Sequence, residues 1–272
     1  EGDIFLHHPY ETFDTVVDFI KLASKDPHVL AIKQTLYRVS GDSQIVKALA
    51  EAAEKGKQVT VLVELRARFD EENNINWAKK LEQRGVHVIY GIYGLKTHSK
   101  ITLVVRREKN KIKRYLHLST GNYNDQTAKI YTDMGLLTCN ESFGSDASVF
   151  FNMVSGFVTS VNTSIMSVAP FTLRQKFNEL IDREIAFAKA GKKAAIIAKM
   201  NSLVDLEIIE KLYDASKAGV KIQLLIRGIC TLKPGIEGVS DHIEVKSIVG
   251  EFLEHSRIFY FENNKKPEIF LS

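Results

Sequence analysis

The sequence feature that most constrains the fold is an internal repeat. Seven positions in one segment match seven positions of a later segment at one constant offset. They are Ile45, Leu49, Ala52, Gly56, Val59, Val61 and Val63 in the first copy, and Ile208, Leu212, Ala215, Gly219, Ile222, Leu224 and Ile226 in the second. Any two strand–helix–strand units look alike to this extent, so the match alone does not establish a duplication. Each copy is later followed by a histidine with a basic residue two positions on, and we therefore predict two related halves.

Each predicted half alternates strands with helices. In the first half we expect strands over 28–36, 58–65, 86–90, 100–105 and 115–118, and helices that begin at Asp42 or Ser43 and at Glu71. In the second half we expect a strand over 193–200, a helix over 206–218 that ends at Gly219, and strands over 221–226 and 258–261. This alternation is typical of an α/β fold with a largely parallel sheet.

The boundary between the halves is predicted near Pro170. The apolar stretch from Val149 to Pro170 contains several Asn, Ser and Thr residues, so we expect a buried helix there and not a membrane span. A proline after this helix favours a break, which gives a first domain over 1–168 and a second over 169–272. The chain opens at Glu1 without a methionine and stops at Ser272 in an apparent strand. We therefore expect a piece of a longer protein whose second domain is truncated.

Composition places few limits on function. Apolar residues make up 44% and charged residues 26% of the chain, as in soluble globular proteins. The net charge of +4 suits an anionic ligand but does not require one. No set of histidines and cysteines has zinc spacing, and the sequence has neither a P-loop nor the glycine-rich loop of protein kinases. If this chain acts on nucleotide phosphates, it binds them without either of these phosphate-binding loops.

The first candidate motif pairs His98 with Lys100. Residues two apart on a strand point to the same face, so an imidazole and an ammonium are expected side by side where the strand begins. Phosphoryl transfer uses this combination, because a neutral imidazole is a nucleophile and a cation attracts phosphate oxygens. A lone His-x-Lys is common and needs support. The loop at 119–124 supplies some, since Asn122 and backbone N–H groups there can hold an anion, although an ordinary turn has the same composition.

The second candidate motif pairs His255 with Arg257 and leads into the strand over 258–261. It occupies the place in the second half that His98 occupies in the first. Two such half-sites could face one another, so that one imidazole attacks a phosphorus atom while the other holds or donates a proton.

Three arginines follow predicted strands. They are Arg38, Arg68 and Arg227. In open α/β sheets ligands bind beyond the carboxyl ends of the strands, and a guanidinium has the fork geometry that phosphate oxygens fit. Any one of these arginines could serve in a surface ion pair instead, but three at equivalent strand ends favour a polyanion site.

The motifs together resemble a known family. The strings in question are 32–38 (IKQTLYR), 67–72 (ARFDEE), 94–100 (GLKTHSK), 119–124 (STGNYN), 131–133 (YTD), 226–230 (IRGIC) and 252–257 (FLEHSR). They resemble the bacterial polyphosphate kinases that use a phosphohistidine. The paired His-x-basic motifs in a duplicated chain also resemble the phospholipase D superfamily, which implies two phospholipase D-like α/β domains related by a pseudo-twofold duplication.

The resemblance implies roles for individual residues. His98 would be the autophosphorylated nucleophile, and His255 the proton donor. Tyr131, Arg227 and His255 would contact ATP or phosphates, together with Lys100 and Asn122 of the motifs above. The family's magnesium positions fall at Arg38 and Arg68; a guanidinium is not a metal ligand, so these arginines would grip phosphates that carry Mg²⁺ or offer a backbone carbonyl.

The resemblance also implies partners and a location. ATP, ADP and inorganic polyphosphate would be the substrates and products of an ATP–polyphosphate phosphotransferase, with no nucleic acid and no transmembrane segment involved. A homo-oligomer is expected for the full-length protein, in the cytoplasm, with peripheral attachment to the inner membrane left open.

Two alternatives stay open at this point. The phospholipase D pattern has an aspartate five residues after the motif lysine, where this chain has Val105, and the second motif has Arg257 in place of lysine. A phosphodiesterase of the phospholipase D type is therefore a weaker reading than a kinase. A fragment that binds polyphosphate without turning it over is the other alternative.

Overall fold

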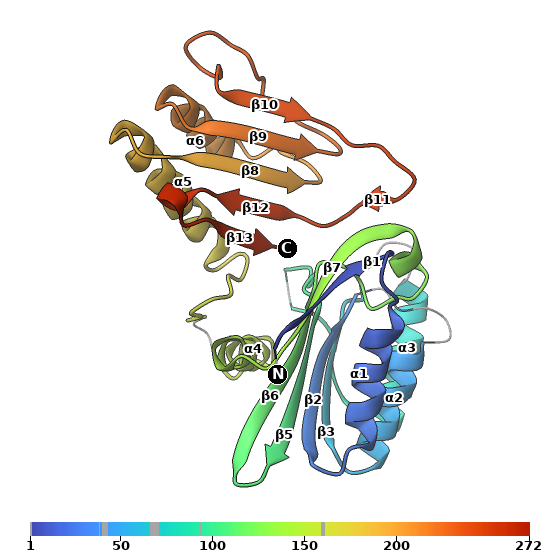
Figure 1. The fold of residues 1–272 in the computed structure, drawn as a ribbon. Helices are drawn as coiled ribbons and strands as arrows, with labels where there is room; N and C mark the ends of the chain where they lie inside the picture. The colour runs from blue at the N-terminus through green and yellow to red at the C-terminus, as the bar shows by residue number, and fades with distance from the viewer. Residues whose placement is uncertain (1, 38, 40–42, 66–70, 93, 159–160) are drawn as a thin grey trace. The chain divides into compact units, whose positions relative to one another are not determined.

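The computed structural model describes residues 2–37, 39, 43–65, 71–92, 94–158 and 161–272, apart from the side chain of Asn73. The chain divides into two compact units, Glu1–Met166 and Ser167–Ser272, which are taken in turn (Figure 1). The boundary expected from the sequence, between residues 168 and 169, lies two residues farther along the chain.

The first unit is a mixed sheet flanked by helices. Its elements are β1 (Ile4–His8), α1 (Asp14–Lys25), β2 (Val29–Leu36), α2 (Gln44–Glu54), β3 (Gln58–Val63), α3 (Glu71–Gln83), β4 (His87–Ile89), β5 (Ile101–Glu108), β6 (Lys111–Ser119), the short 3₁₀ helix η1 (Thr127–Lys129), β7 (Tyr131–Thr138) and α4 (Glu141–Val154). The strand order is β1-β7-β6-β5-β2-β3-β4. Helices α1, α2 and α3 cover one face of the sheet, and α4 lies on the other (Figure 1).

The largely parallel sheet predicted for this half is wrong. Strands β2, β3 and β4 are parallel, but β5 joins β2 antiparallel, and β6, β7 and β1 continue in antiparallel pairs. Only Lys109 and Asn110 connect β5 to β6, and Lys109 has a φ of 51° in that turn. Parallel neighbours need a crossover of about a dozen residues, so this connection permits only a hairpin.

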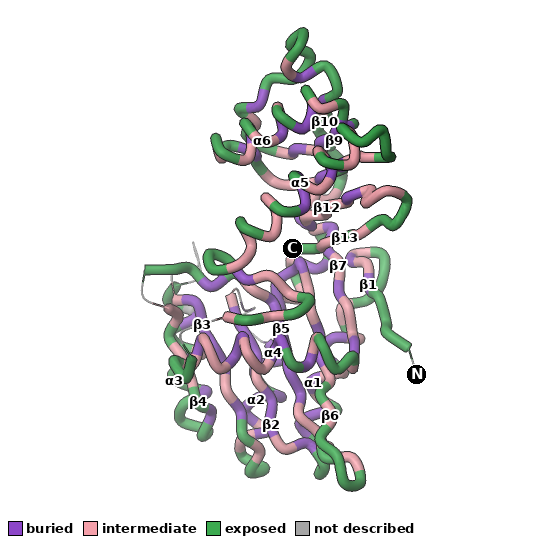
Figure 2. Tube along the Cα trace, turned by 90° about the vertical axis from the view of Figure 1, so that its left-hand side faces the viewer, coloured by how far each residue is buried: buried purple, intermediate pink, exposed green. Residues whose placement is uncertain are grey.

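The core of the first unit lies between the three helices and the parallel strands. Its buried side chains include Ile20 of α1, Leu49 of α2 and Ile32 of β2, and the strands in this region are coloured as buried in Figure 2. The Ser43 hydroxyl accepts a hydrogen bond from the Val46 N–H and so begins α2, one of the two caps expected there. Asp42, the other, lies outside the described residues.

The apolar stretch 149–170 is not the continuous helix predicted. Helix α4 ends at Val154, and Gly156, with a φ of 78°, turns the chain away. The buried carboxylate of Asp146 accepts hydrogen bonds from the N–H groups of Ser164, Ile165 and Met166. Burial opposes ionisation, but these backbone donors hold the pKa of Asp146 below its usual value. None of the described helices is long and apolar enough to cross a membrane.

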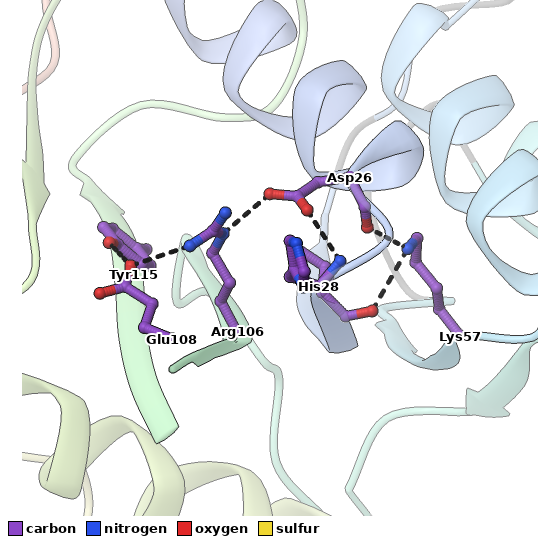
Figure 3. Close-up of polar contacts among 7 residues, drawn as sticks. Asp26, His28, Lys57, Arg106, Glu108 and Tyr115 are labelled. Atoms are coloured by element: carbon purple, nitrogen blue, oxygen red, sulfur yellow. Dashed lines mark hydrogen bonds and ion pairs between the residues drawn. The ribbon is translucent and has the colours of Figure 1, made fainter. Parts of the chain in front are cut away.

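A polar cluster fixes the far end of β5 (Figure 3). The Arg106 guanidinium donates to the Asp26 carboxylate at 2.8 Å and to the Glu108 carboxylate at 3.2 Å. Lys57 donates to the carbonyl oxygens of Asp26, which directly follows α1, and of Val29, the first residue of β2. The hydrogen bond to Arg106 lowers the pKa of Asp26, so the pair stays charged. This end of β5 is opposite to the end where His98 lies.

The second unit repeats the topology of the first. Its elements are α5 (Leu173–Lys189), β8 (Ala195–Met200), α6 (Leu206–Lys217), β9 (Lys221–Ile226), β10 (Ile243–Lys246), β11 (Leu253–Glu254), β12 (Ile258–Phe261), the 3₁₀ helix η2 (Asn263–Lys265) and β13 (Glu268–Leu271). The sheet order is β10-β9-β8-β12-β13. Strands β8, β9 and β10 are parallel, and β12 joins β8 antiparallel, just as β5 joins β2. The duplication predicted from the sequence is confirmed at this level.

Candidate active site

One end of the first unit's sheet gathers the predicted motifs. Strand β2 ends at Leu36, β5 begins at Ile101 and β6 ends at Ser119. The antiparallel register pairs Ile101 with Leu118, and Gln34 of β2 with Thr102. The segments 97–100 and 119–124 and the residue after β2, Tyr37, therefore lie at the same end of the sheet. Tyr131 also lies there, half-buried, as the first residue of β7, which is antiparallel to β6.

His98 and Lys100 are side by side, as expected. The Lys100 Nζ lies 2.8 Å from the His98 Nδ1 and also donates to the His98 carbonyl oxygen. Both residues lie just before β5, which begins at Ile101. Lys100 is buried whereas His98 is exposed, and the His98 ring packs edge-on against Tyr37 with 4.9 Å between centroids. An ammonium only donates, so Nδ1 is the acceptor and a neutral ring carries its proton on Nε2.

Two side chains from neighbouring strands hold the backbone around His98. The Glu64 carboxylate, directly after β3, accepts a hydrogen bond of 2.7 Å from the Thr97 N–H. The Thr35 hydroxyl, in β2, donates to the Ser99 carbonyl oxygen at 2.7 Å and accepts from the Ile101 N–H at 3.1 Å. Glu64 and Thr35 are both buried, so these bonds are shielded from water. The residues on both sides of His98 are thus fixed, and its ring is left at the surface.

A buried asparagine holds the two strand ends together. The Asn74 side-chain amide, on α3, donates to the carbonyl oxygens of Tyr37 at 2.8 Å and Glu64 at 2.9 Å. The sequence reasoning missed Asn74, Glu64 and Thr35. For Thr35 and Glu64 the only signal was a polar residue within an apolar strand or at its end, and this pattern alone says nothing about what the side chain contacts. Asn74 lies in a polar stretch of α3 and gave no signal.

The loop at 119–124 is closely packed. The Thr120 hydroxyl donates to the Asp133 carboxylate at 2.7 Å, and the Gly121 N–H donates to the Ser119 hydroxyl at 2.9 Å. A Cβ atom on Gly121 would lie 2.6 Å from Oδ2 of Asp133, so only glycine fits there. Asn122 is buried in this loop.

Several buried polar atoms at this end have no hydrogen-bond partner within the described part of the chain. They are Thr97 Oγ1, Ser99 Oγ, Asn122 Oδ1 and both amide atoms of Gln34. Native interiors leave few polar groups unsatisfied, and a cluster of them is typical of a place that water or a ligand completes. These atoms lie at the same end of the sheet as the exposed imidazole of His98 and the buried ammonium of Lys100.

Beneath the loop lies a buried network that does not face solvent. The Tyr123 hydroxyl accepts from Thr102 at 2.8 Å and lies 3.0 Å from the His117 Nδ1. Burial, with a smaller effect of His8, lowers the pKa of His117 to about 3. His117, in β6, is therefore neutral at neutral pH.

In the second unit His255 lies between β11 and β12 and is buried. The Arg257 guanidinium donates to the His255 carbonyl oxygen at 3.0 Å. Lys100 makes the same contact to His98, so the two His-x-basic motifs share a local geometry. Arg227 follows β9 directly, and its Nη1 is buried without a hydrogen-bond partner among the described residues. A guanidinium nitrogen left in this state at the carboxyl end of a parallel strand suits an anionic ligand.

Some predicted site residues lie beyond what can be described. Arg38 and Arg68 lie outside the described residues. His98 and His255 belong to different units, and their convergence stays a prediction. Over the described ranges, no three His, Cys, Asp or Glu side chains gather in a way that could hold a metal ion.

Fold and site define a class of protein, a duplicated α/β chain. In each unit a His-x-basic segment lies just before the strand that pairs antiparallel with the parallel part of the sheet, β5 in the first unit and β12 in the second. Comparison with known proteins specifies the class further. The family model described as polyphosphate kinase C-terminal domain 1 matches residues 1–160, and the one described as C-terminal domain 2 matches residues 166–272. The chain belongs to the polyphosphate kinase family.

Individual relatives agree. The chain is 66% identical to the polyphosphate kinase of Halalkalibacterium halodurans over 99% of its own length, and 61% identical to that of Bacillus cereus over its whole length. It spans 38% and 39% of the length of these relatives. The crystal structure of polyphosphate kinase from Porphyromonas gingivalis superposes on 99% of this chain, and on 45% of that one, with a TM-score of 0.91 and 40% identity.

A more distant likeness concerns the fold alone. A mutant of yeast tyrosyl-DNA phosphodiesterase superposes on 96% of this chain, and on 78% of that one, with a TM-score of 0.53 and 7% identity. Together with the repeated topology, it supports the predicted fold class of two related α/β domains, which is confirmed, and the phospholipase D-like character of these domains stays a prediction.

Proposed function

We propose that this chain is the catalytic core of a polyphosphate kinase that moves the γ-phosphoryl group of ATP to polyphosphate, reversibly, through a phosphohistidine at His98. The observation that carries the proposal is the exposed imidazole of His98 held beside the buried ammonium of Lys100. A nucleophile needs access to its substrate, and a buried cation stabilises the charge of a transferring phosphoryl group more strongly than an exposed one. Membership of the family gives the substrates.

In the proposed reaction a nitrogen of His98 attacks the γ-phosphorus of ATP. The nitrogen–phosphorus bond forms as the bond from phosphorus to the bridging oxygen of ADP breaks. A terminal oxygen of the polyphosphate chain then attacks the phosphohistidine, which lengthens the chain by one unit and restores the imidazole. In the absence of substrate Lys100 donates to the His98 ring. When ATP or polyphosphate binds, the same ammonium can donate to the phosphate oxygens instead.

Other residues have supporting roles in the proposal. The unpaired Nη1 of Arg227 suits a phosphate oxygen, and Asn122 and Tyr131 lie at the same sheet end as His98. His255 donates a proton to the departing oxygen of ADP. Arg38 and Arg68 hold phosphates. A cytoplasmic location and a homo-oligomer stay predictions.

Magnesium is the expected companion of ATP, but the described residues do not form a protein site for it. Mg²⁺ prefers oxygen ligands. The described ranges contain no group of three His, Cys, Asp or Glu side chains that could bind it, and a guanidinium is not a metal ligand. The ion would therefore enter with the nucleotide phosphates as part of the substrate.

The test is to incubate the full-length protein with γ-³²P-labelled ATP. The expected product is a protein-bound label that is acid-labile and alkali-stable, absent from His98→Ala and present in His87→Ala, since His87 is an exposed histidine on β4. His255→Ala should slow the labelling. Label that persists in His98→Ala overturns the proposal, and turnover of phosphodiesters without ATP would support a phosphodiesterase instead. Polyphosphate binding by residues 1–272 without turnover would identify a binding fragment.

A further inference from the structure

In each unit a side chain on the strand beside the histidine segment holds that segment. The side chain is a threonine of β2 in the first unit and a lysine of β8 in the second. We propose that Lys199, acting with Glu254, is a positioning residue for His255; this rests on the role proposed above for His255. Lys199 lies outside the motif strings, Glu254 belongs to the string 252–257 without a role assigned there, and both lie within the second unit.

The register of the strands establishes the equivalence. In the first unit Gln34 pairs with Thr102, so Thr35 lies opposite Ile101, the first residue of β5. In the second unit Lys199 pairs with Ile258, the first residue of β12. Thr35 and Lys199 therefore occupy the same place, on the strand beside the one that the histidine segment enters.

Both side chains donate to the same backbone group. The Thr35 hydroxyl donates to the carbonyl oxygen of Ser99, the residue after His98, at 2.7 Å. The Lys199 ammonium donates to the carbonyl oxygen of Ser256, the residue after His255, at 3.1 Å, and to the Ser256 hydroxyl at 2.8 Å. The hold on the first histidine is thus repeated at the second.

Lys199 also holds the residue before His255. Its ammonium lies 2.8 Å from the Glu254 carboxylate, and the two side chains are 16% and 23% exposed. Lysine has three N–H donors, and Glu254 together with the two oxygens of Ser256 engages all three. Lys199 therefore has no donor left over for a phosphate oxygen, which assigns it to positioning and not to substrate binding.

The arrangement fixes the backbone on both sides of His255. Glu254 and Ser256 are both tied to one ammonium, and Arg257 binds the His255 carbonyl oxygen. Removing the ammonium would take a close countercharge from the largely buried Glu254 carboxylate and a hydrogen-bond donor from Ser256, and the segment would shift in response. A displacement of about 1 Å at a catalytic group costs on the order of 100-fold in rate.

The experiment is a double-mutant cycle in the full-length protein. Lys199→Met should lower kcat for phosphoryl transfer by about 10- to 100-fold, with the KM for ATP changed less than about twofold, because Lys199 does not touch substrate. The same substitution in a His255→Ala background should cost little more, because the effect passes through the imidazole. Lys199→Thr, which installs the residue of the first unit, should retain more activity than Lys199→Met.

Two further variants complete the design. Lys211→Met is the matched control, since Lys211 is 23% exposed, lies in the same unit and pairs with Asp182 at 2.8 Å; kcat should be unchanged. Glu254→Gln tests the ion pair if Lys199→Met does not fold, and should lower kcat without changing KM. If His255→Ala has no effect, the function proposed for His255 fails. If His255→Ala slows transfer but Lys199→Met does not, the positioning inference alone fails. It also fails if Lys199→Met lowers kcat as much in the His255→Ala background as in the wild type.

Discussion

The Nζ of Lys100 lies 2.8 Å from Nδ1 of His98, close enough that the two groups share one hydrogen bond. The ammonium is buried and the imidazole is exposed. In the reaction proposed above, a phosphate that reached the His98 ring would therefore meet a cation already fixed beside it.

This pair gives the first prediction. Lys100→Met should slow phosphorylation of His98 by about 100-fold or more, because a fixed charge at the transferring group is removed. Lys100→Arg should retain part of the rate, since it keeps the charge but not the compact shape. Lys96→Met, an exposed lysine in the same segment, is the control and should leave the rate unchanged. Single-turnover labelling with γ-³²P-ATP measures it, and an unchanged rate in Lys100→Met would contradict the role given to the ammonium.

Thr35→Val should loosen the segment that carries His98. Valine has nearly the same shape but neither donates to the Ser99 carbonyl oxygen nor accepts from the Ile101 N–H. Leaving buried groups unsatisfied costs about 1–3 kcal/mol. Hydrogen exchange over residues 97–103 should accelerate, whereas Thr60→Val on β3 should leave that segment protected. Equal exchange in both variants would mean that Thr35 does not hold the backbone.

Gly121→Ala should disturb the loop that carries Asn122. The new methyl group would lie 2.6 Å from Oδ2 of Asp133, so either the carboxylate or the loop must move. We expect a loss of about 1–3 kcal/mol in stability and a lower rate of labelling. Gly250→Ala is the control, because a Cβ there meets nothing within 4 Å. The Cβ of Asp133 would also lie 2.8 Å from the new methyl group, so the rescue variant is Asp133→Gly; added to Gly121→Ala it should restore part of the stability, and its failure to do so would place the strain elsewhere.

Stability should fall as the solution becomes acidic, partly because of His117. Burial lowers its pKa from the ordinary 6.5 to about 3, so the unfolded chain takes up this proton first. The contribution of His117 is full above pH 6.5 and is lost as the pH falls toward 3, at up to about 1.4 kcal/mol per pH unit. Denaturant unfolding between pH 7.5 and 4.5 should show a shallower dependence in His117→Gln than in the wild type. His242→Gln, at an exposed site, should not change the slope.

The sequence predicted the elements that carry strong local signals. Helix α3 begins at Glu71 and ends at Gln83, the bounds expected from its polar start and the glycine that follows. The repeat was also readable, because equivalent apolar positions recur at a constant offset. Local patterns did not reveal the antiparallel course of β5, which depends on how strands meet and not on their composition.

The supporting residues of the site could not be predicted for the same reason. Thr35 contacts a residue 64 positions later, Glu64 one 33 positions later and Lys199 one 57 positions later. No spacing rule covers such separations, since only the folded sheet brings these groups together. The motif histidines were recognisable because their basic neighbours lie two residues away.

A hydroxyl in the first unit and an ammonium in the second perform one backbone task. Dissolved ions hardly affect a bond between neutral groups, but they compete with an ion pair that water partly reaches, such as Lys199 and Glu254. The two equivalent holds therefore differ in their response to ionic strength: added salt weakens the ion pair of Lys199 and Glu254 beside His255, and leaves the neutral hydrogen bond from Thr35 beside His98 unchanged.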